Sequence, residues 1–544
     1  MGILKNGNNK KIRTGKRLVS ICLTAVMILS ATACNGTSAG SPAASAPSPG
    51  APAETSGTAV TEAGSEGTTA GNQAANIPVP PAEVTLMVNY TGAEAPTDDN
   101  PLVQLISEYT GSQIKITWVP QSAYNEKLNT LIASKDLPQI TTIREVKSAG
   151  FVNAARSGMF WDINPYIELF PNLNAIDKTV MQNVQIDGMQ VLIPKVRDIA
   201  REGGILRQDW LDAVDMEMPA DVDGLYDVLY AFTYNDPDQN GKDDTYGFSL
   251  KYNALPRFST LLSIYMGGPN TWGIDESGQV VPEFYFDTYT ESLTWFRRAY
   301  AEGLFNQDFP ICKDEMQNFT SGAAGMLFLG NLEDAATRVT DLNAVYPDAS
   351  TDIFQLLKYA NEPYHITGYQ GYTGGLAFSK TAVKTEEELL GLLAFLDKLA
   401  DPDIADGMNW GIEGETYMVK DGGVEQTKDQ ADLYGRKYND IRQITPFYTT
   451  KNLTANDQPE LNQKIVKLMN ENEEYAVHNV VLPFISDTNV ETGGDLEEQI
   501  NDAKIKYVIG ELDLDGWMAA IKSWEDAGGS QMIKEYTEQY QAGN

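Results

Sequence analysis

Residues 236–247 carry the side chains in this sequence that are best spaced to bind a metal ion. Oxygen-bearing side chains occupy loop positions 1, 3, 5 and 9, Gly241 stands at position 6, and position 7 would supply a backbone carbonyl, as in an EF-hand. Gly247 replaces the bidentate glutamate that closes an EF-hand, so we expect a rigid structural Ca²⁺ site rather than a calcium sensor. A polar turn without metal is the alternative. The predicted ligands are Asp236, Asp238, Asn240, Lys242 and Asp244.

Aromatic side chains form a second group with a chemical use, because sugars offer apolar C–H faces that stack on flat rings. The chain contains 26 Tyr and 8 Trp residues. Trp272 follows a Gly-Gly-Pro-Asn turn and Trp410 precedes a glycine, so each stands at a loop where a ring can project. Tyr372 lies beside the glycine turn before a late strand. We predict that these three rings contact ligand, with core packing as the alternative for each.

Polar partners for sugar hydroxyls complete the predicted site. Arg207 has the forked guanidinium that suits paired hydroxyls or a sugar carboxylate. Glu413 would accept hydroxyl hydrogen bonds, or else stabilise its own turn. Tyr90 ends the first predicted strand, and ligands of α/β sheets lie beyond the carboxyl ends of strands.

Composition excludes several classes of protein. The chain has 544 residues, 75 acidic and 40 basic side chains and a net charge of -35, which disfavours nucleic acid as a partner. Three Cys and two His exclude most Cys/His metal sites and any framework of several disulfides. The charge also disfavours polyanionic sugars, although screening over about 8 Å lets a local arginine override the global field.

The N-terminal residues predict export and a lipid anchor. A basic segment precedes an apolar run at 18–33, which is shorter than a membrane-spanning helix requires. The run ends in Ser-Ala-Thr-Ala before Cys34, which resembles a bacterial lipobox, so we expect diacylglycerol on the Cys34 thiol; an ordinary signal peptide is the alternative. We assign 1–33 to the signal peptide and the residues 34–82, rich in Gly, Ala, Ser, Thr and Pro, to a flexible tether.

The globular body begins with a β-α-β pattern: a strand at 84–90, a helix at 102–109 and a strand at 113–119. This order favours an α/β fold with parallel strands. Apolar residues at three- and four-residue spacing predict further helices, and a glycine turn leads into a strand near 374–379. These helices are expected at 288–301, 385–400, 460–470 and 514–527.

Five segments occur in the order of landmarks of a known family, and they are 204–211, the loop 236–247, 270–273, 300–305 and 410–417. Together they resemble the extracellular solute-binding proteins, family 1, of ABC importers, in the branch of large Gram-positive lipoproteins related to alginate-oligosaccharide binders. The resemblance implies a two-lobed clamp of the type II periplasmic-binding-protein fold, with discontinuous lobes, a hinge and aromatic residues lining the cleft. The implied parts are 83–195 and 366–430 for lobe 1, and 196–365 and 431–544 for lobe 2.

The function implied is capture of an extracellular carbohydrate, most simply an oligosaccharide, by a monomeric, lipid-anchored protein that delivers it to an ABC permease. A binder of peptides is one alternative. A secreted glycoside hydrolase is the other, because two suitably placed carboxyls cannot be excluded from sequence. No G-x-S-x-G, H-E-x-x-H, P-loop or G-x-G-x-x-G motif occurs in the chain, so we expect no enzyme activity.

Overall fold

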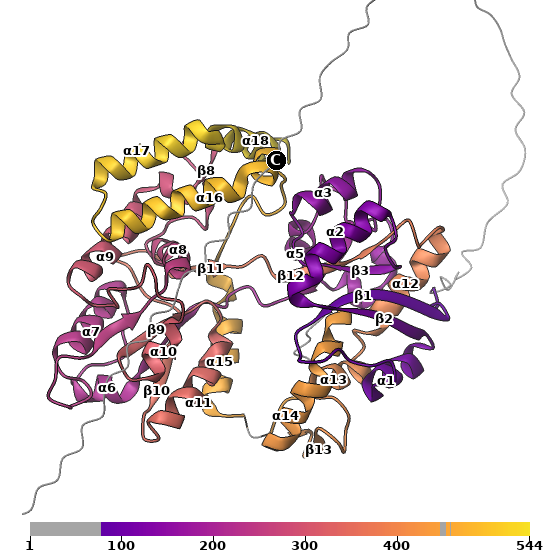
Figure 1. Cartoon of the computed structure of the whole chain (residues 1–544), viewed down its shortest axis with the longest axis horizontal. Helices are drawn as coiled ribbons and strands as arrows, with labels where there is room; N and C mark the ends of the chain where they lie inside the picture. The colour runs from indigo at the N-terminus through magenta and orange to yellow at the C-terminus, as the bar shows by residue number, and fades with distance from the viewer. Residues whose placement is uncertain (1–77, 447–452, 457, 544) are drawn as a thin grey trace, which may run out of the picture. The chain divides into compact units, whose positions relative to one another are not determined.

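The computed structural model describes residues 78–446, 453–456 and 458–543, which all belong to one unit of the fold, residues 73–544 (Figure 1). The predicted signal peptide, Cys34 and nearly all of the tether lie outside the described residues.

The first lobe is built on a five-stranded sheet with the order β2-β1-β3-β12-β4. β1 pairs in parallel with β2 and β3, whereas β12 is antiparallel to both β3 and β4. The predicted β-α-β start is confirmed, with β1, α1 and β2 each within a residue or two of the expected bounds. The strands are β1 (Glu83–Tyr90), β2 (Gln113–Pro120), β3 (Ile140–Ile143), β4 (Leu192–Val196) and β12 (Tyr372–Phe378).

Helices on this lobe follow local signals in the sequence. α12 begins with a capping box in which Thr385 and Glu388 satisfy each other's backbone N–H groups, and its leucines point into the core. The helices are α1 (Pro101–Thr110), α2 (Tyr124–Ser134), α3 (Ala149–Arg156), α4 (Pro171–Asn174), α5 (Lys178–Asn183), α12 (Glu386–Lys398), α13 (Pro402–Trp410) and α14 (Lys428–Lys437), with a hairpin of β13 (Met418–Lys420) and β14 (Gly423–Glu425).

The carboxyl ends of four strands lie at one edge of the first sheet. β1, β2, β3 and β4 all run in one direction, so their carboxyl ends lie at the same edge as the start of β12. This carboxyl edge contains Tyr90, Ile143, Val196 and Tyr372, the last two of which pair with each other. In open α/β sheets this is the edge at which ligands bind.

The second lobe has a four-stranded sheet with the order β10-β5-β9-β6, in which β5 is antiparallel to β9 and β10. The strands are β5 (Gly203–Arg207), β6 (Tyr246–Ser249), β9 (Ala324–Leu329) and β10 (Thr351–Phe354). The helices are α6 (Gln208–Ala213), α7 (Val222–Tyr234), α8 (Leu255–Tyr265), α9 (Asp287–Ala301), α10 (Glu315–Thr320), α11 (Ala335–Val345) and α15 (Glu460–Glu471), and a hairpin is formed by β7 (Trp272–Ile274) and β8 (Val280–Pro282).

Three C-terminal helices share a hydrophobic core with the second lobe (Figure 1). They are α16 (Asp487–Val508), α17 (Leu514–Trp524) and α18 (Ser530–Gly543). Trp517 and Trp524 are buried there against Phe284, which follows β8. α17 ends earlier than the sequence predicts, because a π-turn with Gly528 at φ 141° begins after Trp524.

The chain passes between the two sheets at 197–202 and returns at 369–371, next to the parallel pair of β11 (Ile366–Gly368) and β15 (Ala476–His478). The sequence predicts a last crossing near 425–435. Instead, Tyr438 and Ile441 are buried in the core of the first lobe, and Val196 donates its N–H to the carbonyl of Pro446. The chain therefore stays with the first sheet at least to Pro446, because apolar side chains of the turn after α14 complete that core.

Candidate functional site

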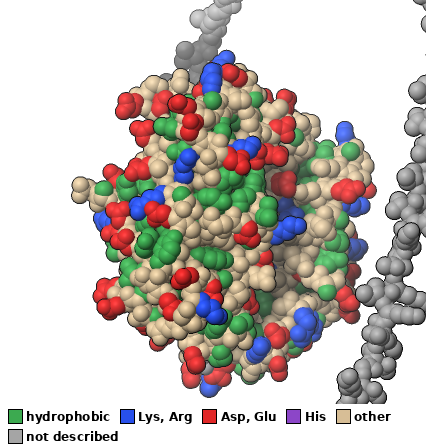
Figure 2. All heavy atoms as spheres, turned by 60° about the vertical axis from the view of Figure 1, so that its left-hand side comes forward, with side chains coloured by type: hydrophobic (Ala, Val, Ile, Leu, Met, Phe, Trp, Pro, Cys, Tyr) green, Lys and Arg blue, Asp and Glu red, His purple; other side chains and the backbone are tan. Residues whose placement is uncertain are grey.

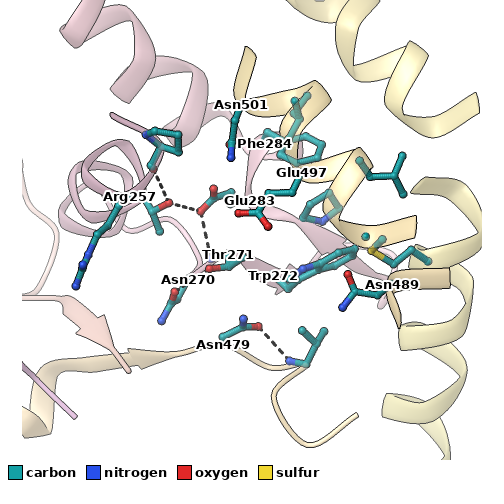
Figure 3. Close-up of a pocket in the computed structure, with 18 of the residues that line it drawn as sticks. Arg257, Asn270, Thr271, Trp272, Glu283, Phe284, Asn479, Asn489, Glu497 and Asn501 are labelled. Carbon is teal, nitrogen blue, oxygen red and sulfur yellow. Dashed lines mark hydrogen bonds between the residues drawn. The ribbon is translucent and has the colours of Figure 1, made fainter. Parts of the chain in front are cut away.

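The second lobe contains a cavity of about 1070 Å³, which is large enough for an oligosaccharide (Figure 3). Its walls come from α8, the β7–β8 hairpin, β11, the segment that follows β15, and the helices α16 and α18. Segments more than 200 residues apart in the chain, such as 270–272 and 479–501, therefore meet around one space.

Trp272, which the sequence predicts to contact ligand, lines this cavity. The turn before it is held by Asn270, whose amide donates to the carbonyl oxygens of Gly368 and Val477, each at 2.8 Å. The indole is only 8% exposed, because its ring packs edge-to-face on Tyr536 with 4.9 Å between the ring centroids. Trp272 thus forms part of the wall, with a small accessible area.

A buried ion pair supports the same turn. Glu283 and Lys504 are 4% and 5% exposed, and their Oε1 and Nζ atoms are 3.4 Å apart. The second oxygen of Glu283 accepts hydrogen bonds from the Thr260 hydroxyl at 2.8 Å and the Thr271 N–H at 3.2 Å. Burial lowers the pKa of Lys504, and the neighbouring Glu283 opposes this effect. The pair fixes the hairpin of Trp272 against α16.

Amide and carboxylate side chains line the rest of the cavity, and these were not found from the sequence. Asn479, Asn489, Glu497 and Asn501 lie along the segment from β15 into α16, with Asn501 and Glu497 on the helix above Trp272 (Figure 3). Amides offer both donors and acceptors, which suits the dual character of sugar hydroxyls. Nothing in their local sequence distinguishes these residues from ordinary polar positions of a helix surface.

A polar network joins the cavity to the two segments at which the chain changes lobe. The buried carboxylate of Glu202 accepts hydrogen bonds from Arg257 Nε and the Tyr369 hydroxyl, each at 2.5 Å. Burial raises the pKa of Glu202, against the effect of Arg257. Lys147, from the first lobe, also lines the cavity, and its Nζ donates to the carbonyl oxygen of Gln185 at 2.6 Å.

Four of the other predicted ligand residues are spread over the first lobe. Tyr90 and Tyr372 are half-buried at the carboxyl edge, and burial raises the pKa of Tyr372 to about 12. Trp410 is half-buried at the end of α13, where its indole N–H donates to the Leu453 carbonyl at 3.0 Å. Glu413 is exposed in the turn that follows. None of these four residues lines the cavity of the second lobe.

Arg207 is not brought to the cavity. It ends β5, opposite Thr351, whereas Gly203 at the other end of the strand follows Glu202 of the cavity wall. The buried guanidinium is bound by both carboxylate oxygens of Asp209 and lies 4.8 Å from the centroid of the Trp210 ring. Because β5 runs away from the crossing segment, Arg207 lies at the far edge of the sheet and stabilises the start of α6.

The predicted calcium loop joins α7 to β6. Its Asp236 carboxylate accepts the backbone N–H groups of Asn240 and Gly241 at 3.1 and 3.0 Å. The Asn240 amide group donates to Asp238 at 2.7 Å and to Asp244 at 3.0 Å. Among the described residues, no group of three or more His, Cys, Asp or Glu side chains is gathered for a metal ion. Oxygen ligands of the right type therefore lie next to one another, but they are not gathered around one point.

Two lobes with separate sheets, repeated crossings between them and a polar cavity define a two-lobed solute-binding protein. No model of a known protein family matches the chain. The chain is 33% identical over 470 residues to the lipoprotein LipO of Bacillus subtilis, which covers 84% of this chain and 92% of that protein. It is also 33% identical over 442 residues to the polygalacturonan/rhamnogalacturonan-binding protein YtcQ of the same organism, covering 80% and 87% of the two chains.

The crystal structure of the alginate-binding protein AlgQ2 without calcium ion has the same fold, with a TM-score of 0.61 and 18% identity over 86% of this chain and all of that chain. The chain belongs to the family of extracellular solute-binding proteins of ABC importers. The predicted family and fold class are thus confirmed, and the protein is a binding protein rather than an enzyme.

The similarity to a lipoprotein supports the predicted location at the outer face of the cell membrane. Across the described ranges, no helix is both long and apolar enough to cross a membrane.

Proposed function

We propose that this protein captures an extracellular oligosaccharide in the cavity beside Trp272 and delivers it to an ABC permease. The single observation that carries this proposal is the lining of the cavity. Asn479, Asn489, Glu497 and Asn501 place amide and carboxylate groups around a space that also has aromatic walls. Such a mixture binds the hydroxyls and the apolar faces of sugars at the same time.

The relatives support a carbohydrate over a peptide. YtcQ is named for binding polygalacturonan and rhamnogalacturonan, and AlgQ2 for binding alginate. Extended peptides are commonly bound by adding a strand to an exposed sheet edge. Binding in this cavity does not require such an edge.

The first lobe would complete the site through its carboxyl edge. Tyr90 and Tyr372 stand at that edge, and Lys147 from the same lobe already reaches the cavity. A ligand that contacts both lobes binds the closed arrangement more tightly than the open one, and only this difference in affinity drives closure. Trp410, Arg207 and Glu413 have no part in this proposal, because their contacts lie elsewhere.

We also propose that the loop 236–247 binds a structural Ca²⁺ ion. Asp236, Asp238 and Asp244 each accept a hydrogen bond from Asn240, and the carbonyl of Lys242 is the fifth candidate ligand. The Asn240 N–H₂ group, which bridges two carboxylates, would have to turn so that its oxygen faces the ion. The ion would replace repulsion among three carboxylates with coordination.

The test is isothermal titration of the mature protein with neutral and acidic oligosaccharides, and with peptides of similar size. Asn501→Ala removes a half-buried amide of the cavity, and we expect about a tenfold loss of affinity for the bound sugar, as for one lost hydrogen bond. Asn470→Ala, an exposed position of α15 outside the cavity, is the matched control. Binding of peptides alone, or equal effects of both substitutions, would overturn the proposal.

A further inference from the structure

One arginine stands in the wall of the cavity. Arg257 lies in α8, and it is the only arginine among the described residues that line this space. Its side chain is 44% exposed, although the Glu202 carboxylate to which it is bound is buried. Figure 3 shows Arg257 on one side of the group of lining residues and Asn489 on the other, with Trp272 between them in this view. A ligand that extends from Trp272 towards α8 would therefore reach this side chain.

The guanidinium of Arg257 is held in one orientation by three residues, called here the arginine seat: Glu202, Gly330 and Tyr369. Nε donates to Glu202 Oε1 and Nη2 donates to the Gly330 carbonyl oxygen, each at 2.5 Å. Cζ lies 5.1 Å from the centroid of the Tyr369 ring, in a cation–π contact. A Cβ on Gly330 would overlap the guanidinium, so this close approach requires glycine.

The arginine seat is itself fixed by the segments that cross between the lobes. Glu202 ends the first crossing and Tyr369 begins the second, and the Tyr369 hydroxyl donates to the same carboxylate oxygen that Arg257 binds. The Tyr369 N–H donates to the Ile199 carbonyl at 3.1 Å, which joins the two crossings through their backbones. Gly330 directly follows β9. Three segments that are remote in sequence therefore hold one guanidinium against the cavity.

The guanidinium keeps several N–H groups for a ligand. It carries five N–H donors in one plane, and the seat uses only one on Nε and one on Nη2. In the part of the chain that the structure describes, Nη1 donates to no residue. Two of the remaining N–H groups can donate to two neighbouring oxygen atoms at once, and the fixed plane of the seat gives this fork a set direction.

The positive charge of Arg257 is already balanced by Glu202, just as Lys504 is balanced by Glu283. Three basic and four acidic side chains line the cavity in all, so the lining has no surplus of positive charge. Acidic side chains are also widely spread over the face shown in Figure 2, where Lys and Arg side chains form only a few small groups. Hydroxyl oxygens suit such a fork, because they accept hydrogen bonds without adding a negative charge.

We propose that Arg257 determines the specificity of the cavity, where two of its N–H groups bind two neighbouring hydroxyl oxygens of one sugar ring. The residues of the arginine seat are positioning residues, which fix the direction of the fork without contacting the sugar through it. This inference rests on the proposed function, because it assigns a role within the oligosaccharide site. A purely structural role for Arg257 would make affinity independent of which hydroxyls the ligand carries.

The experiment is titration calorimetry of the mature protein with linear gluco-, manno- and galacto-oligosaccharides of four sugar units. The tetrasaccharide that binds most tightly is then compared with its monodeoxy derivatives. We expect the loss of either hydroxyl of one neighbouring pair to weaken binding to the wild-type protein about tenfold. Arg257→Lys should weaken the parent sugar at least tenfold and leave the affinity for these two deoxy derivatives within about twofold of the wild-type value.

Lysine is a suitable replacement because it keeps a positive charge beside the buried Glu202 while removing the planar fork. Gly330→Ala tests the seat from outside the cavity, because its Cβ displaces the guanidinium without changing any residue that lines the cavity. This variant should lose the same discrimination between the parent sugar and the two deoxy derivatives. Thermal unfolding of both variants shows whether each remains folded.

Arg298→Lys is the matched control. Arg298, in α9, is bound to Glu302 at 3.1 Å and lies 4.1 Å from the centroid of the Tyr226 ring, and the Tyr226 hydroxyl donates to Glu302 at 2.8 Å. The control thus repeats the combination of arginine, glutamate and tyrosine, but none of its three residues lines the cavity. Its substitution should change the affinity for neither the parent sugar nor the deoxy derivatives.

The outcomes separate this inference from the proposed function. If Arg257→Lys weakens the parent sugar and every deoxy derivative alike, or leaves all of them unchanged, Arg257 does not bind a pair of hydroxyls and the inference is wrong while the carbohydrate function stands. If the wild-type protein binds none of the oligosaccharides and binds peptides instead, the proposed function itself is wrong, and the inference falls with it.

Discussion

Replacing Lys195 with methionine should stabilise the ligand-free protein, and by an amount that depends on pH. The pKa of Lys195 falls from its ordinary value of 10.5 to about 7, with burial as the largest cause and the positive charges of Arg197, Arg442 and Arg144 as the others. The proton affinity of the Lys195 amino group is therefore lower in the folded state than in the unfolded chain. The unfolded chain binds more protons in the window between these two values, so the stability contributed by this residue rises with pH there.

The magnitude follows from the same two values. Below about pH 7 the lysine is charged in both states, and the folded protein bears a cost of about 5 kcal/mol, at 1.36 kcal/mol for each tenfold change in proton affinity. Above about pH 10.5 it is neutral in both states and this cost is absent. Between pH 6 and pH 9 the cost decreases by about 3 kcal/mol. Methionine retains the apolar stem and carries no charge, so the variant should lack this dependence.

The assay is urea unfolding of the wild-type protein and of Lys195→Met at several pH values from 6 to 9, without ligand. Other titrating groups act on both proteins and cancel in the difference between their free energies of unfolding. The advantage of the variant should be largest at pH 6 and should decrease by about 3 kcal/mol towards pH 9. A difference that is constant over this range would refute the reasoning, because Lys195 would then not lose its proton near pH 7 in the folded state.

Three further predictions concern other parts of the chain. Cys34→Ser should release the protein into the medium, as measured by immunoblotting of cell and medium fractions, and retention on cells would contradict the lipid anchor. Chelation of calcium should lower the melting temperature in a thermal-shift assay, and Asp236→Ala with Asp238→Ala should abolish that response; an unchanged melting temperature of the wild-type protein would mean that the loop holds no ion. Glu283→Gln should destabilise the protein by about 3–5 kcal/mol because it leaves buried Lys504 unpaired, and adding Lys504→Met should recover most of that loss; urea unfolding measures both, and no recovery would mean that Glu283 acts through its other hydrogen bonds.

Much of the local structure could be predicted from the sequence. The helix expected at 288–301 is α9, the one at 385–400 is α12, and the one at 460–470 is α15, because their apolar residues recur at the spacing of one helix face. The order of short landmarks indicated the family, and residue types alone identified the candidate calcium loop and the lipidation motif. These inferences need only a few neighbouring residues, whose relation is set by helix and strand geometry.

Which residues meet at the site is set by the order and direction of the strands. Local sequence patterns do not contain this information. Trp272 was predicted to contact ligand and lines the cavity. Arg207 lies away from the cavity, because its position follows from the direction in which β5 leaves the crossing segment. Asn479 and Asn501 join Trp272 only because α16 returns across the second lobe. Their sequence neighbourhoods resemble any exposed helix surface.

The basic residues at the carboxyl edge of the first sheet show the same division. The sequence by itself determined that the chain is strongly acidic and that an arginine at the right place could override this charge. Only the tertiary structure brought Arg144, Lys195 and Arg442 to one edge, from positions separated by 51 and 247 residues. The physical reason is that β12 returns between β3 and β4, so charged residues that are remote along the chain follow or lie in strands that end at the same edge of one sheet.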